Sequence, residues 1–150
     1  MKVRWLGVAA LAVVLVWLLS PTAQPVSQFL IGADIPLDTR AILLRSCADC
    51  HSDGTRYPWY SHLPLLSRMI AEDVARGREQ LNFSRWNEYS RLRKQRALTG
   101  IANQVKDRAM PLPNYLWLHP SARLSDAEIE TVFRWADKER LRLILSADIK

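Results

Sequence analysis

The stretch Cys47-Ala48-Asp49-Cys50-His51 contains both cysteines of the 150-residue chain. Two cysteines separated by two residues are typical of redox dithiols, metal sites and structural disulfides, but none of these requires a histidine directly afterwards. The pattern Cys-x-x-Cys-His is the attachment sequence for a c-type haem. Two thiols on one helical turn reach the two vinyl groups of a porphyrin, and the adjacent imidazole is directed at the iron. The stretch therefore predicts one haem held through Cys47 and Cys50, with His51 as the proximal iron ligand.

Other uses of the two cysteines remain open on the sequence alone. A thioredoxin-like dithiol requires a βαβ setting, whereas the residues around Cys47 and Cys50 have the pattern of helix and loop. A Cys2His2 zinc site would need both cysteines and two of His51, His62 and His119, which the number of donors allows. A protein without haem, in which Cys47 and Cys50 form a dithiol or bind zinc, is therefore kept as an alternative.

A six-coordinate haem iron needs a second ligand from elsewhere in the chain. Met110 opens the segment Met-Pro-Leu-Pro-Asn-Tyr, whose prolines favour a stiff, non-helical loop. Such a loop can hold a thioether over a porphyrin, so we predict Met110 as the distal ligand and His119 as the second choice. Met69 lies on the apolar stripe of a predicted helix and is expected to fill a core. His62 is too close to the attachment stretch to reach the other face of the haem.

The chain from residue 37 onwards has the pattern of helices joined by irregular loops. We expect helices over residues 38–48, after Pro64 with a break near Gly77, from Ser84 to about Asp107 in one or two pieces, and after Ser125. The last is the most clearly marked, because Ser125 and Glu128 have the spacing of a capping box. The sequence has no convincing alternating strand pattern and no internal repeat. The predicted fold class is all-α.

The first 23 residues differ from the rest. Lys2 and Arg4 precede an unbroken apolar run over residues 5–19, and small or polar residues follow, which is the layout of an export signal. The cleavage site is poor, because Pro21 stands where a small residue is preferred, and the run is shorter than the roughly 20 residues that span a bilayer comfortably. We favour an uncleaved membrane anchor slightly over a cleaved signal peptide. Both place the remainder on the periplasmic side of a bacterial cytoplasmic membrane.

Residues 24–36, with prolines at both ends and no helical period, are expected to be a linker, which leaves residues 37–145 as the haem-binding domain.

Composition and charge restrict the classes of partner that the protein is expected to bind. The sequence lacks both glycine-rich phosphate-binding patterns, which excludes nucleotide binding through such loops. The net charge of +6 is spread along the chain, and no aromatic residues alternate with its basic stretch over residues 91–96, so no nucleic-acid partner is expected. An acidic protein or an anionic membrane surface suits this charge better.

Further motifs follow the cysteine stretch in a fixed order: Tyr57-Pro58-Trp59-Tyr60-Ser61, Gly77-Arg78, Leu81-Asn82-Phe83-Ser84-Arg85-Trp86, Met110-Pro111, Tyr115, His119-Pro120 and Leu124-Ser125. With them, residues 42–135 resemble the bacterial haem-binding domain family of small single-haem c-type cytochromes. The resemblance implies a compact, cytochrome c-like helical domain around one covalent haem c. It implies thioether bonds at Cys47 and Cys50, with His51 proximal and Met110 distal.

The resemblance also implies which residues surround the haem: Tyr57, Trp59, Tyr60, Asn82 and Trp86. Their phenol, amide and indole groups would bind the propionates, and the alternative is that they pack in the core. Arg56, Arg78 and Arg108 are further candidates for the propionates. The second ring nitrogen of His51 is expected to donate to a backbone carbonyl, for which residues near Pro58 or Pro64 are natural acceptors.

A His/Met-ligated iron has no free position for a substrate, so the sequence favours a one-electron carrier over an enzyme. Its partner would be a redox protein, acidic or membrane-bound, reached from the membrane itself if the N-terminal segment is retained. The alternative is a haem-based sensor or a peroxidase-like protein in which Met110 is displaced from the iron. In that case His119 or Arg108 would assist at the open position.

Overall fold

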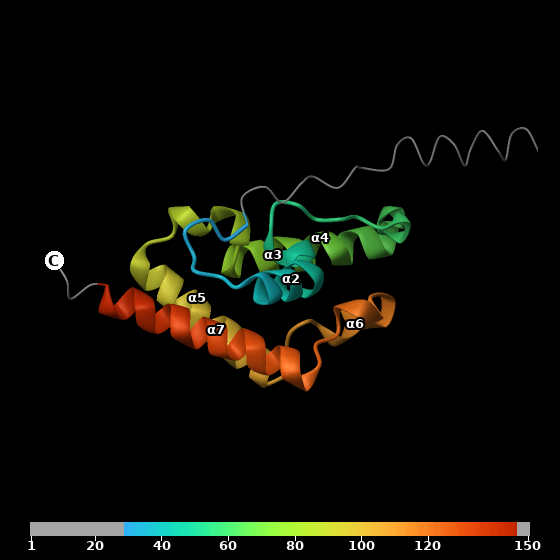
Figure 1. Cartoon of the computed structure of the whole chain (residues 1–150). Helices are drawn as coiled ribbons and strands as arrows, with labels where there is room; N and C mark the ends of the chain where they lie inside the picture. The colour runs from blue at the N-terminus through green and yellow to red at the C-terminus, as the bar shows by residue number, and fades with distance from the viewer. Residues whose placement is uncertain (1–28, 147–150) are drawn as a thin grey trace, which may run out of the picture.

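The computed structural model describes residues 29–146 of the chain, so the predicted signal or anchor over residues 1–23 lies outside the described residues. Within residues 29–146 the protein consists of helices and loops without a β-strand, as the all-α fold class predicts (Figure 1). None of the helices in this range is both long enough and apolar enough to cross a membrane.

The helices are α2 (Leu37–Ser46), α3 (Ala48–His51), α4 (Pro64–Gln80), α5 (Arg91–Lys106), α6 (Pro113–Leu118) and α7 (Asp126–Leu145), with 3-10 turns η1 (Trp59–His62), η2 (Phe83–Glu88) and η3 (Pro120–Ala122). The helix expected over residues 38–48 ends earlier, at Ser46, and the single-turn helix α3 follows after Cys47. The break expected near Gly77 is absent, since α4 continues to Gln80. The region after Ser84 is in two pieces, the second beginning after the N-cap Ser90.

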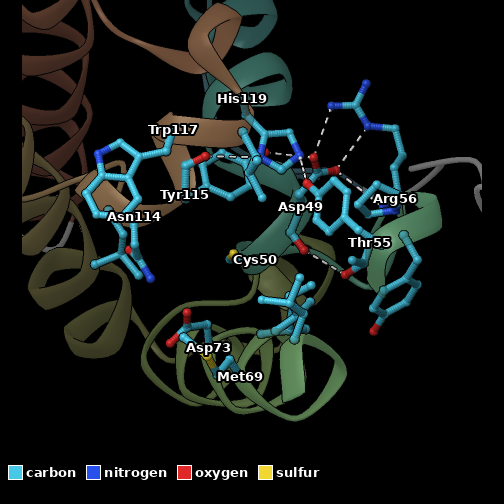
Figure 2. A pocket seen from close by; sticks show the side chains of 18 residues that line it. Asp49, Cys50, Thr55, Arg56, Met69, Asp73, Asn114, Tyr115, Trp117 and His119 are labelled. Carbon is cyan, nitrogen blue, oxygen red and sulfur yellow. Dashed lines mark hydrogen bonds and ion pairs between the residues drawn. The ribbon is translucent and has the colours of Figure 1, made fainter. Parts of the chain in front are cut away.

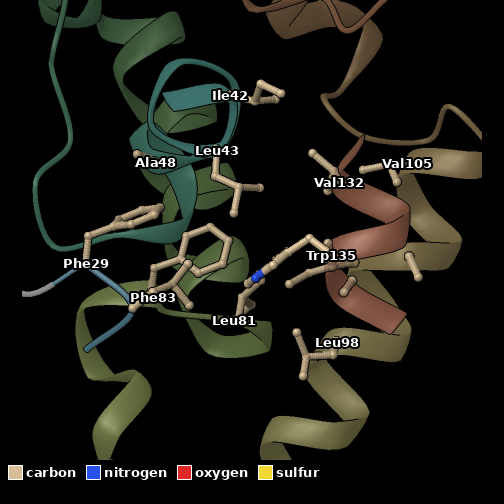
Figure 3. Close-up of a cluster of buried hydrophobic side chains, with 14 of the residues drawn as sticks. Phe29, Ile42, Leu43, Ala48, Leu81, Phe83, Leu98, Val105, Val132 and Trp135 are labelled. Atoms are coloured by element: carbon tan, nitrogen blue, oxygen red, sulfur yellow. The ribbon is translucent and has the colours of Figure 1, made fainter. Parts of the chain in front are cut away.

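Helices α5 and α7 lie alongside each other and form the main scaffold (Figure 1). Leu98 and Val105 of α5 are buried against Val132 and Trp135 of α7, and Leu43 of α2 joins them from the other side (Figure 3). Each such side chain contributes about 1.5–3 kcal/mol when it is fully withdrawn from water. At the start of α7, Ser125 and Glu128 form both hydrogen bonds of the predicted capping box.

The described part of the predicted linker, residues 29–36, is anchored to the core by its first two residues, Phe29 and Leu30, which are buried. Phe29 is 1% exposed, its ring centroid lies 4.8 Å from that of Phe83, and its carbonyl accepts a hydrogen bond from Arg40. The indole N–H of Trp135 donates to the carbonyl of Asp34. The lack of a helical period was real, but a short irregular segment can bury two large side chains without showing any period. The folded domain therefore extends at least to residue 29.

Candidate functional site

Helix α3 places both thiols and the imidazole on one turn. The N–H of Cys47 closes α2 by donating to the Leu43 carbonyl, and the Cys47 carbonyl then accepts from the N–H of His51 at 3.0 Å. Both cysteines are free thiols and half-buried. Burial raises the pKa of Cys47 to about 12 and that of Cys50 to about 11. Both therefore carry their proton near neutral pH, unlike the activated thiolate of a redox dithiol.

The imidazole of His51 is oriented by backbone carbonyls. Its Nδ1 lies 3.0 Å from the carbonyl oxygens of both Gly77 and Leu81. Because carbonyls only accept, Nδ1 carries the ring proton, and Nε2 of the neutral ring keeps a lone pair. Burial lowers the pKa of His51, which favours that neutral ring. This is the state in which an imidazole binds a metal.

The acceptors of His51 differ from those expected near Pro58 and Pro64. They lie at the C-terminal end of α4, which passes directly behind α3. The approach is so close that a Cβ atom built on Gly77 would lie 2.8 Å from the Cys50 carbonyl oxygen. Gly77 is thus required as a contact point between two helices, which explains why it lies inside α4 without breaking it.

A cavity of about 310 Å³ adjoins Cys50, with largely apolar walls. One wall is α4 and the opposite wall is formed by residues 112–119, which include α6 (Figure 2). The residues that line it are Asp49, Cys50, Thr55, Arg56, Tyr57, Pro58, Tyr60, Leu66, Met69, Ile70, Asp73, Val74, Leu112, Asn114, Tyr115, Trp117, Leu118 and His119. A concave, mostly apolar space with a few polar groups is typical of a cofactor site.

The structure brings only some of the predicted haem surroundings to this cavity. Tyr57 and Tyr60 line it, whereas Trp59 does not and is 73% exposed. Asn82 instead caps η2, accepting from Ser84 and donating to Asp53. Trp86 is buried in the main core. Trp86 thus has the core-packing role considered as the alternative, whereas the Asn82 side chain is used in the cap of η2.

Met110 lies in the loop between α5 and α6, half-buried, and is not among the residues that line the cavity. Leu112, two residues later, is among them. Met69 was expected to fill a core, which is wrong: it lies on the cavity wall and is 47% exposed. The apolar stripe of α4 that carries Met69 lines the cavity, so this apolar helical pattern indicates a cavity wall and not a packed interior. His62 is exposed.

His119 lines the cavity, but both of its ring nitrogens have partners. Nδ1 lies 3.1 Å from the Tyr115 carbonyl and so carries the proton, while Nε2 accepts from the Tyr60 hydroxyl at 2.9 Å. The ring also stacks on Tyr115, with centroids 4.0 Å apart. The lone pair that a metal would need is therefore engaged in the hydrogen bond from Tyr60.

The three arginines considered for the propionates are paired within the protein. Arg56 donates to both carboxylate oxygens of Asp49. Arg78 donates to the Ser52 carbonyl and to the Thr55 hydroxyl. Arg108 forms an ion pair with Asp126, the first residue of α7. In this structure they connect segments of the chain instead of being directed into the cavity as free cations.

The sequence reasoning missed Asp49 and Tyr115. Asp49 has no role predicted from the sequence, although this residue is only 9% exposed and its carboxylate accepts from Arg56 and from the Tyr115 hydroxyl. Its position in the sequence could have indicated a role. A turn predicted to pack against a haem buries its side chains, and a buried carboxylate needs hydrogen-bond partners. Tyr115 was noted in a motif without a function.

The donor set fits a c-type haem. Two protonated thiols and a neutral imidazole with a free Nε2 lie on one turn, next to an apolar cavity. A zinc site fits less well, because within residues 29–146 no three His, Cys, Asp or Glu side chains are grouped to hold a metal ion.

An all-helical domain with two thiols and an imidazole on one turn beside an apolar cavity is the arrangement expected of a haem-binding protein. The family model described as "Haem-binding domain" matches residues 9–138, and the chain belongs to that family. No curated protein and no solved structure matches the chain.

Proposed function

We propose that the protein is a monohaem c-type cytochrome that carries single electrons. Cys47 and Cys50 hold the haem covalently, His51 is the proximal ligand and Met110 the distal one. The observation that carries the proposal is the state of His51: two carbonyls fix the proton on Nδ1 and leave Nε2 with a lone pair, on the turn that carries both thiols. When bound, the haem supplies one-electron exchange between ferric and ferrous iron.

The protein itself would hold the haem in a fixed orientation and enclose it. The carbonyls of Gly77 and Leu81 prevent rotation of the His51 ring, so the ligand direction is the same in both oxidation states. The apolar side chains of α4 and of residues 112–119 would shield the bound group from water, and ligation by a Met thioether and a His would raise its reduction potential relative to two histidines. If His51 and Met110 both bind the iron, no position would be left for a substrate, so the bound group would supply electron transfer and not catalysis.

The proposed location and partner rest on the sequence. An export signal or retained anchor over residues 1–23 would place the domain on the periplasmic side of the cytoplasmic membrane, where c-type haem is attached. The net charge of +6 favours an acidic redox partner, whose association would be fast and sensitive to salt. A retained anchor would restrict that partner to the vicinity of the membrane.

A second candidate is favoured by one observation: Tyr60 and His119 line the cavity, whereas Met110 does not. If the Met110 loop stays in this position, the distal side is open, as in a haem sensor or a peroxidase-like protein. Rapid binding of carbon monoxide to the reduced protein would support this candidate over the carrier.

The deciding experiment is an absorption spectrum of the full chain, co-expressed with haem-attachment machinery in a bacterial periplasm. We expect low-spin ferrous bands and the weak far-red ferric band of sulfur-to-iron charge transfer. That far-red band should disappear in Met110→Ala and persist in Met69→Ala, which removes the other methionine of the described residues.

Three results would contradict the proposal in different ways. A colourless protein would favour the dithiol or zinc pair. A low-spin spectrum that Met110→Ala leaves unchanged would transfer the distal role to His119. High-spin iron that binds carbon monoxide rapidly would establish the open-site alternative.

A further inference from the structure

Helix α6 forms one wall of the cavity but is not anchored by the core. None of the residues Pro113–Leu118 is buried, and Trp117 is 81% exposed. The helix lies beyond the end of the α5–α7 scaffold, and its backbone neighbour is η3, which follows it directly in the chain (Figure 1). Apolar burial therefore contributes little to the position of this wall, and polar contacts must determine it.

Two side-chain hydrogen bonds connect α6 to the other side of the cavity (Figure 2). The Tyr115 hydroxyl donates to Asp49 Oδ2 at 3.0 Å. This bond links α6 to the turn over residues 47–51, which is called the attachment turn below. The Tyr60 hydroxyl donates to Nε2 of His119 at 2.9 Å, which links η1 to the residue that ends α6. The stacking of His119 on Tyr115 joins the two links into one unit.

We propose that Asp49 and Tyr115 form a clasp, defined by their hydrogen bond, that holds α6 against the attachment turn and thereby fixes the position of Met110. Met110 lies three residues before Pro113. Pro111 and Pro113 restrict the backbone between Met110 and α6, so the position of α6 largely determines that of Met110. Asp49 is thus a positioning residue. Its effect on Met110 rests on the proposed function, whereas its hold on α6 belongs to the protein itself.

The charge of Asp49 makes the clasp stronger than an ordinary hydroxyl contact. A hydrogen bond to a charged acceptor stabilises more than a neutral one, and a buried carboxylate that loses its donor is costly. Arg56 completes the site with bonds from Nε at 3.0 Å and Nη2 at 3.3 Å, and the main-chain N–H of Arg56 donates to the same carboxylate. Arg56 orients the carboxylate, which leaves Oδ2 within hydrogen-bond distance of Tyr115.

The first measurement is amide hydrogen exchange on the full chain, reported for residues 114–119. Tyr115→Phe deletes the donor but keeps the ring that stacks on His119. The matched control is Tyr89→Phe, which deletes a hydroxyl that accepts from the Asn82 N–H in η2, away from the cavity. We expect exchange of the α6 amides to be about tenfold faster in Tyr115→Phe than in wild type and unchanged in Tyr89→Phe. Equal exchange in the two variants would overturn the clasp.

The second measurement tests the effect on Met110 through displacement by imidazole in the ferric, haem-loaded protein. We expect Tyr115→Phe to bind imidazole about tenfold more tightly, because a larger fraction of molecules has the loop released. Asp49→Asn should act in the same direction, although it also weakens the ion pair with Arg56. Tyr115→Phe should add little in the Asp49→Asn background, because the contact with Tyr115 is already weakened there. Imidazole binding equal to that of wild type in Tyr115→Phe, or the same increase from Tyr115→Phe in both backgrounds, would contradict the coupling.

The two proposals can fail separately. A chain without haem, or with a spectrum that Met110→Ala leaves unchanged, contradicts the proposed function, and the exchange of the α6 amides still decides the clasp. A chain with His/Met-ligated haem whose α6 exchange is the same in Tyr115→Phe and Tyr89→Phe contradicts the clasp alone.

Discussion

Gly77 is the residue at which α4 passes closest to the attachment turn. A Cβ atom there would lie 2.8 Å from the Cys50 carbonyl oxygen and 3.2 Å from the Cys50 Cβ, neither of which can move without the backbone, so a helix must move to admit it. We expect Gly77→Ala to lower the free energy of unfolding by about 1–2 kcal/mol, although alanine favours helix by about 1 kcal/mol. Urea denaturation measures this.

Gly100 provides the control, since it lies inside α5 and a Cβ atom on it would meet nothing within 4 Å. Gly100→Ala should raise the free energy of unfolding by about 0.5–1 kcal/mol. If both variants gain stability equally, the close contact between α4 and α3 is not a constraint.

At the scale of residues, the sequence was sufficient to place Cys47, Cys50 and His51 on one turn but not to identify the contacts that support them. The spacing of Cys47, Cys50 and His51 predicts one turn with three donors, because it depends only on helical geometry. The acceptors for His51 and the partner of Asp49 depend on how α4 and α6 pack. Leu81 lies 30 residues after His51, and Tyr115 lies 66 residues after Asp49. No local pattern encodes such a distant pairing.

At the scale of elements, the start of α7 combines a cap with an ion pair. Glu128 accepts from the Ser125 backbone and from Arg45 of α2 at 2.8 Å. Arg45, and then the Ser125 backbone, lower the pKa of Glu128 to about 2. The folded pKa is below the unfolded value of about 4.3, so the stabilisation is complete above about pH 4.5 and is lost as the pH falls towards 2.

We therefore expect Glu128→Gln to lose about 1 kcal/mol of unfolding free energy at pH 7, a value reduced for the partial exposure of the pair. The variant should also show a flatter decline in stability between pH 4.5 and 2. Denaturation at a series of pH values measures both. Glu72→Gln, which breaks the exposed pair of Glu72 with Arg68, is the control and should change stability little. An unchanged acid decline in Glu128→Gln would contradict this account.

The elements that the sequence predicts well are those with their own local signals. The capping box marks α7, and Pro64 with an apolar stripe marks α4. Helix α6 escapes prediction because six residues with no buried face leave no period to detect. The division of α2 from α3 at Cys47 also lacks a sequence signal, because neither a proline nor a glycine stands there.

At the scale of the molecule, the segment before α2 connects the N-terminal part of the chain to the core. Phe29 fills a site beside Phe83, so Phe29→Ala should lower the free energy of unfolding by about 3–5 kcal/mol. Ile31→Ala, two residues away and 48% exposed, should cost well under half as much. Urea denaturation of both variants tests whether the segment is core or linker, and equal small losses would favour a linker.

The all-helical class could be predicted because the sequence offers no alternating pattern for a strand. The anchoring of residues 29–34 to the core could not, because it depends on contacts of Phe29 with Phe83 and of the Asp34 carbonyl with Trp135, which lie in distant elements. The same limit applies to the cavity. Its two walls, α4 and α6, are far apart in the chain, and only the folded molecule brings them to opposite sides of Cys50.

The support of His51 by main-chain carbonyls has a consequence for how this protein tolerates mutation. Every residue type has a carbonyl, so replacing the Leu81 side chain leaves the acceptor in place, and the orientation of the imidazole is buffered against most substitutions around it. The buffer fails only where a change displaces the path of α4 itself, as a Cβ atom at Gly77 does. Surrounding side chains can therefore change over evolution while the direction of the His51 imidazole stays the same.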